Sequence, residues 1–90
     1  MIEIRKVEDD LAAPFVVCDG CSQPITDGAG NVAWDEDEDD RLVRIYHKSC
    51  DPEQGGPWAE LPEFFFRLIH NTKIDLKAGE ESARSLDAIE

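Results

Sequence analysis

The sequence predicts a small α+β domain, with a short antiparallel sheet followed by one main C-terminal helix. Three observations predict it. The chain has 90 residues, enough for one domain with one small core. Short alternating segments rich in β-branched and aromatic residues occupy its middle, and a helical pattern with an apolar face follows at residues 60–71. We expect residues 1–78 to form a single domain and residues 79–90 a weakly structured or short helical tail.

The first segment, IEIRKV, alternates Ile2 and Ile4 with charged residues and therefore predicts an edge strand. The segment KIDLK after the helix alternates Ile74 and Leu76 in the same way, so the two segments could pair with one another. No stretch approaches the roughly 20 apolar residues of a membrane span, and the first residues do not resemble a cleavable leader. We expect a soluble, cytoplasmic protein that does not contact a membrane.

Two pairs of potential metal ligands frame the predicted sheet. Cys18 and Cys21 form a C-x2-C pair, and His47 and Cys50 form an H-x2-C pair. Zinc takes four ligands in a tetrahedron, and two residues between paired ligands let one tight turn aim both side chains at a single point. The chain has 3 cysteines, an odd number that argues against a disulfide framework. The sequence therefore predicts one structural zinc ion bound by these four residues, although iron is an alternative.

Glycine and acidic residues mark the turns of this region. Gly20, inside the first ligand pair, can adopt a positive φ at no steric cost. The glycine-rich turn after QPIT and the short alternating stretch NVAW predict a hairpin at residues 22–34. The acidic run at residues 35–40 lacks the spacing of a calcium loop, so we expect a solvated tip between two strands. RLVRIYH then predicts a strand that ends at His47.

The stretch CDGCSQPITDGAGNVAW, followed by YHKSC, resembles the first zinc half of a LIM domain. The shared features are the C-x2-C knuckle, an isoleucine after a proline, an acidic-glycine turn and an aromatic residue directly before H-x2-C. The resemblance covers residues 18–50 and ends there, because no further cysteine supplies a second zinc half. It implies a treble-clef-like module of knuckle, hairpin and helix with a structural metal. Such modules occur in adaptors, nucleases and ribosomal proteins, so function stays open.

The helical segment has one broad apolar face, and Pro62 suits its first turn. We expect Trp58 to cover the same core beside Trp34. The expected core-facing residues of the helix are Leu61, Phe64, Phe65, Leu68 and Ile69.

Two residues on the opposite side of this helix are candidates for contact with a partner. Phe66 either packs under the N-terminal segment or lies on a partner-binding or self-association surface. His70 could replace His47 as a metal ligand or act as a general base, and the simpler alternative is an interaction with the helix dipole. We expect no catalytic residue.

The charge balance bears on the partner. The chain has 21 acidic and 9 basic residues and a net charge of -12, which opposes direct nucleic-acid binding. We therefore expect a zinc-stabilised module that binds a protein or forms a homodimer, and that is not an enzyme. One alternative is a regulator or nucleic-acid mimic that acts on a nucleic-acid-binding protein. Another is a treble-clef nuclease, which would need a histidine beyond the four ligands.

Overall fold

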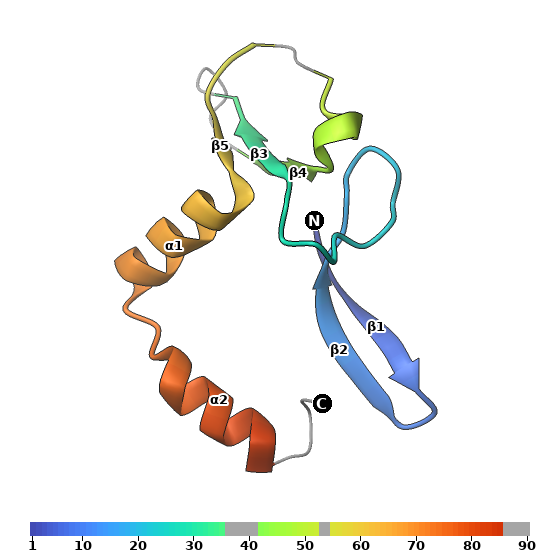
Figure 1. Cartoon of the computed structure of the whole chain (residues 1–90), viewed down its shortest axis with the longest axis vertical. Coiled ribbons are helices and arrows are strands. Elements are labelled where there is room, and N and C mark those ends of the chain that lie inside the picture. The colour runs from blue at the N-terminus through green and yellow to red at the C-terminus, as the bar shows by residue number, and fades with distance from the viewer. Residues whose placement is uncertain (36–41, 53–54, 86–90) are drawn as a thin grey trace.

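The computed structural model describes residues 1–35, 42–52 and 55–85 and confirms a small mixed α+β domain (Figure 1). The described residues form two antiparallel sheets and two α-helices, with a 3-10 turn between the fourth and fifth strands. In chain order the elements are β1 (Ile2–Glu8), β2 (Leu11–Val16), β3 (Asn31–Trp34), β4 (Val43–Tyr46), η1 (Lys48–Cys50), β5 (Trp58–Glu60), α1 (Leu61–Thr72) and α2 (Leu76–Ser85).

The first sheet is the hairpin of β1 and β2, in which Ile2 pairs with Val16 and Ile4 with Pro14. The expectation that IEIRKV could pair with KIDLK is therefore wrong. A neighbouring segment closes a much shorter loop, so pairing with it costs less chain entropy. KIDLK is no strand, because Lys73 ends α1 with a φ of 58° and the Asp75 carboxylate accepts a hydrogen bond from Ala78 N at the start of α2.

The second sheet has the strand order β4–β3–β5, with both neighbours antiparallel to β3. The hairpin expected at residues 22–34 is wrong, because only the end of this segment forms a strand. Asn31 of β3 faces Tyr46 of β4 and Glu60 of β5. The expected tip between β3 and β4 falls at residues 35–40, and residues 36–40 lie outside the described part of the chain.

A small core lies between the second sheet and the first turns of α1. The sheet pairs Val32, which is fully buried, with Ile45 and Ala59. The side chain of Trp34 contacts Phe64 of α1, with ring centroids 6.1 Å apart. The buried hydrophobic residues are Val17, Cys18, Ile25, Val32, Ile45, Ala59 and Leu61.

Three large apolar side chains for which burial was considered are exposed in the structure. Trp58 is 58% exposed, because its pairing with Ala33 turns it to the sheet face opposite Val32. Phe66 is 71% exposed, so the expectation that it packs under the N-terminal segment is wrong. Leu68, expected to face the core, is 39% exposed.

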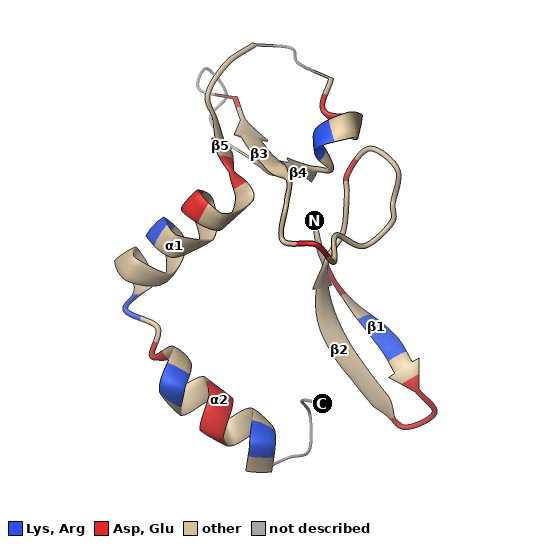
Figure 2. Cartoon of the chain, in the orientation of Figure 1, with Lys and Arg blue, Asp and Glu red and all other residues tan. Residues whose placement is uncertain are grey.

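The molecule is more open than its length requires. Its radius of gyration is 14.8 Å, whereas a compact 90-residue domain has about 12 Å. The β1–β2 hairpin forms one arm of the molecule, and α1 followed by α2 forms another (Figure 1). Acidic residues gather at the hairpin turn, while both signs of charge occur along α2 (Figure 2). Among the described residues, neither helix has the length and apolarity that a membrane crossing demands.

Candidate metal centre

The first ligand pair lies on a tight turn directly after β2. Cys18 N donates to Gln23 O at 2.9 Å, and Ser22 N donates to Cys18 O at 2.9 Å, which curls the chain around Cys21. The positive φ of this turn belongs to Ser22, at 64°, and not to Gly20 as expected. Gly20 is needed for space, because a Cβ there would lie 3.2 Å from Cys50 Cβ.

The second ligand pair follows β4. The strand ends at Tyr46, and the 3-10 turn η1 begins directly after His47. Cys50 N donates to His47 O at 2.9 Å, which folds the H-x2-C segment into one turn. Both ligands of this pair are therefore presented from one end of the sheet.

Asp19 attaches the knuckle to β4 beside His47. Its backbone N donates to Ile45 O at 2.7 Å, and its carboxylate accepts from Ile45 N at 2.7 Å. The same carboxylate oxygen lies 3.0 Å from the amino group of Met1. Sequence analysis missed this role, since an acidic residue within a knuckle looks like any solvated turn residue. These contacts fix the position of the Cys18–Cys21 turn relative to the end of β4, from which His47 and Cys50 follow.

The ligand atoms of Cys18, Cys21, His47 and Cys50 all lie within 4.8 Å of one another. His47 Nδ1 lies 3.4 Å from Cys21 Sγ and 3.9 Å from Cys50 Sγ. A tetrahedral site with the usual zinc bond lengths separates sulfur from nitrogen by about 3.6 Å and two sulfurs by about 3.8 Å. The four residues could therefore hold one metal ion with little rearrangement, and Nδ1 is the nitrogen that faces the sulfurs.

Burial and hydrogen bonding give the thiols different acidities. Burial raises the pKa of Cys18, but backbone N–H groups of His47, Cys21 and Gly20 outweigh it and lower this pKa from 9.0 to about 6. Cys18 Sγ accepts hydrogen bonds of 3.3 Å from both Gly20 N and His47 N. Burial and the neighbouring thiols raise the pKa of Cys50. A thiolate at Cys18 thus provides the first anionic ligand for a cation.

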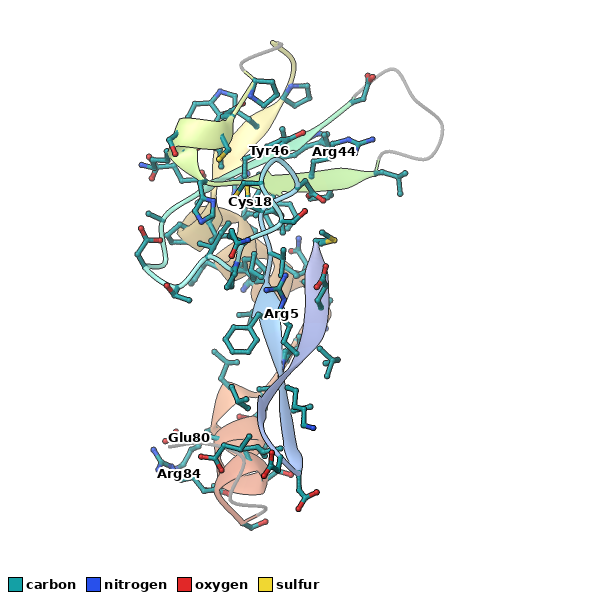
Figure 3. The ribbon with its side chains drawn as sticks, turned by 90° about the vertical axis from the view of Figure 1, so that its right-hand side faces the viewer. Arg5, Cys18, Arg44, Tyr46, Glu80 and Arg84 are labelled. Atoms are coloured by element: carbon teal, nitrogen blue, oxygen red, sulfur yellow. The ribbon has the colours of Figure 1, made fainter. Side chains whose placement is uncertain are left out.

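The surroundings of the cluster place it at the junction of the knuckle and the second sheet. Figure 3 shows Cys18 just above the hairpin arm that carries Arg5, with Tyr46 and Arg44 on the sheet above it. Arg5 Nη2 donates to Ser22 O at 2.9 Å, so the arm is tied to the knuckle. Cys18 is buried, whereas Cys21 is exposed.

The two partner-binding candidates lie elsewhere. Phe66 and His70 stack with ring centroids 6.4 Å apart and an interplanar angle of 9°, and both are exposed on α1. Among the described residues, the cluster that could hold a metal ion contains His47 and not His70. The alternative in which His70 serves as a ligand in place of His47 therefore has no support in the geometry.

Comparison with protein-family models, with curated proteins and with solved structures finds no match to this chain. The function of the site is therefore inferred from its own residues.

Proposed function

We propose that the chain is a small binding module, stabilised by one structural zinc ion, that binds another protein and carries out no catalysis. The observation that carries the proposal is the convergence of three sulfurs and one imidazole nitrogen from two separate segments. In this proposal residues 18–50 form a treble-clef-like unit similar to the first zinc half of a LIM domain.

The donor set favours zinc. Thiolates are soft ligands that select zinc, copper(I) or iron, and a set of three sulfurs and one imidazole suits tetrahedral zinc best. Four protein ligands would complete the coordination shell and leave no position for a reacting water, which supports a structural role. Zinc bound here would link Cys18 and Cys21 after β2 to His47 and Cys50 after β4.

The small core explains why a metal would be needed. Among the described residues, the largest side chains that are fully buried are those of Val17, Val32 and Cys18, all of them small. Below about 70 to 80 residues of packed chain, a single apolar core rarely gives a large margin of stability, and a structural metal often supplies the rest. Metal binding and folding should therefore be coupled.

The exposed aromatic residues support a binding role. Phe66 lies at 71% exposure on the side of α1 opposite the core, stacked on His70. Trp58, at 58% exposure, lies on the outer face of the second sheet. Aromatic side chains contribute large apolar area at protein contact sites, so these two residues are candidates for contact with a partner. Neither residue is needed to complete the core.

The two histidines of the chain allow a matched test of the metal centre. Native mass spectrometry of the purified protein should show one zinc per chain, lost in His47→Ala and Cys50→Ser and retained in His70→Ala. Chelation should abolish cooperative unfolding of the wild-type protein and of His70→Ala alike. Zinc-free protein that folds cooperatively, or zinc loss in His70→Ala, would refute the assignment of these ligands.

A further inference from the structure

The outer edge of β1 is a free sheet edge. Among the described residues no third strand joins the β1–β2 sheet, and β1 lies on its outer side (Figure 1). The other edge is less available, because Pro14 of β2 has no N–H and Val16 O already accepts a hydrogen bond from Ile25 N at 2.8 Å. Such an edge presents unpaired N–H and C=O groups to any strand that can align with it.

The hydrogen-bond alternation of the hairpin shows which residues of β1 point outward. Met1 and Val17 exchange both backbone hydrogen bonds, at 2.8 and 2.7 Å. Hydrogen-bonded and non-hydrogen-bonded residue pairs alternate along an antiparallel ladder. The pairs Ile2–Val16 and Ile4–Pro14 are therefore of the non-hydrogen-bonded kind. The register stays regular as far as Lys6. Ile2, Ile4 and Lys6 therefore direct their N–H and C=O groups away from β2.

We propose that two copies of this chain pair through their β1 edges, antiparallel about a two-fold axis, with Ile4 opposite Ile4 of the second copy. In this register Ile2 faces Lys6 of the second copy, so every outward-pointing residue meets another one. On the opposite face Glu3 lies across from Arg5 of the second copy, and the axis repeats this contact. A two-fold axis requires such self-complementarity.

Charge selects this register over its neighbours. Moving the axis to Glu3 would place two Glu3 carboxylates opposite each other, and moving it to Arg5 would do the same with two guanidinium groups. Like charges directly opposite one another destabilise a sheet, whereas opposite charges stabilise it. Glu3 and Arg5 already form an ion pair of 3.2 Å within one chain, so the dimer would join four alternating charges.

The net charge of -12 does not prevent this association. In β1 itself the acids Glu3 and Glu8 balance the bases Arg5 and Lys6, so the edge is locally neutral. Repulsion from the rest of the chain acts over longer distances, and at about 0.15 M salt it is screened beyond roughly 8 Å. The edge residues Ile2 and Ile4 are 62% and 69% exposed and gain cover from the second copy.

The accessible surface leaves room for such an interface. The chain exposes 7127 Å², whereas a compact monomer of this mass exposes about 5,300 Å². Pairing would also support the hairpin, since a two-stranded sheet is marginal in water and a four-stranded sheet is not.

The inference rests on the proposed function in one respect: it names a second copy as one protein partner. Sedimentation velocity of the zinc-loaded full chain in about 0.15 M salt, from about 1 μM to 1 mM, should show a monomer–dimer equilibrium with a dimer mass twice 10.1 kDa. Metal content measured on the same samples separates failure of this inference from failure of the metal assignment. A monomer throughout this range overturns the inference.

A charge swap tests the register. Arg5→Glu turns both Glu3–Arg5 contacts across the axis into repulsive ones and should raise the dimer dissociation constant about tenfold or more. The double variant Glu3→Arg/Arg5→Glu restores opposite charges and should recover dimerisation. Arg5 also donates to Ser22 O, and both variants lose that contact. If Arg5 acted only through its hydrogen bond to Ser22 O, both variants would be equally impaired, and equal impairment overturns the register.

Ile4→Pro tests the backbone pairing independently, because it removes an outward N–H that the hairpin does not use. It should abolish the dimer, whereas Ile4→Val keeps the N–H and should retain it. Folding of Ile4→Pro is checked by its zinc content. A zinc-loaded Ile4→Pro that still dimerises overturns the proposal, and if this variant loses zinc the charge swap alone decides.

Discussion

Gly30 lies where the sheet, the metal-binding segment and α1 meet, and replacing it with alanine should disturb all three. It is buried, and a Cβ at this position would lie 2.8 Å from Tyr46 O. The same Cβ would lie 3.4 Å from Ile25 Cδ1 and 3.5 Å from Leu61 Cδ2. Because the nearest atom belongs to the backbone of β4, no side-chain rotation can relieve the contact.

The magnitude follows from this geometry. The overlap with Tyr46 O has to be relieved by moving β3 away from β4, and overpacking of this kind costs about 1 to 3 kcal/mol. For a domain of this size each kcal/mol lowers the melting temperature by about 4 to 8 °C. Tyr46 directly precedes His47, so the same movement shifts a ligand and should weaken zinc binding. Leu61 N donates to Gly30 O at 2.9 Å, so the start of α1 is affected too.

Thermal unfolding followed by circular dichroism, with a zinc-competition titration, measures both effects of Gly30→Ala. Gly79→Ala is the matched control, because a Cβ at Gly79 in α2 would meet no atom within 4 Å beyond its chain neighbours and the backbone of its own helix, and alanine favours a helix. We expect the control to melt at or above the temperature of the wild-type protein. A Gly30→Ala protein that melts within about 2 °C of wild type with unchanged zinc affinity would refute the reasoning.

The aromatic residues of α1 and the acidity of the site give two further predictions. Phe66→Ala should change the free energy of unfolding by less than about 0.5 kcal/mol, whereas Phe65→Ala, which removes a half-buried ring packed against the core, should cost about 2 to 3 kcal/mol in urea titrations. Equal losses would place Phe66 in the core. Zinc affinity should fall as the pH decreases towards about 6, because protons compete with zinc for the thiolate ligands. The lowered pKa keeps Cys18 ionised down to about pH 6, whereas Cys50, with its raised pKa, has to release a proton when it binds zinc. Chelator competition between about pH 6 and pH 8 measures this, and a flat profile would contradict it.

Much of the metal centre could be predicted from local sequence patterns. The two spaced pairs of Cys18, Cys21, His47 and Cys50 mark candidate ligands, because paired ligands two residues apart need only one turn each to converge. The apolar periodicity and Pro62 predicted α1, whose observed range of Leu61–Thr72 differs little from the expected one. Both features depend on contacts between near neighbours in the chain.

Strand pairing and burial were decided only by the tertiary structure. The sequence offered KIDLK as a possible partner of IEIRKV, and only the fold shows that β1 pairs with β2 and that KIDLK ends one helix and begins the next. The exposure of Phe66 and Trp58 depends on how little of the chain is available to cover them. Asp19 and Gly30 gain their roles from contact with β4, which lies far from them in sequence. The physical reason is that ligand pairs and helices depend on residues close together in the sequence. Strand register and the space available to a side chain depend on how closely distant parts of the backbone approach one another.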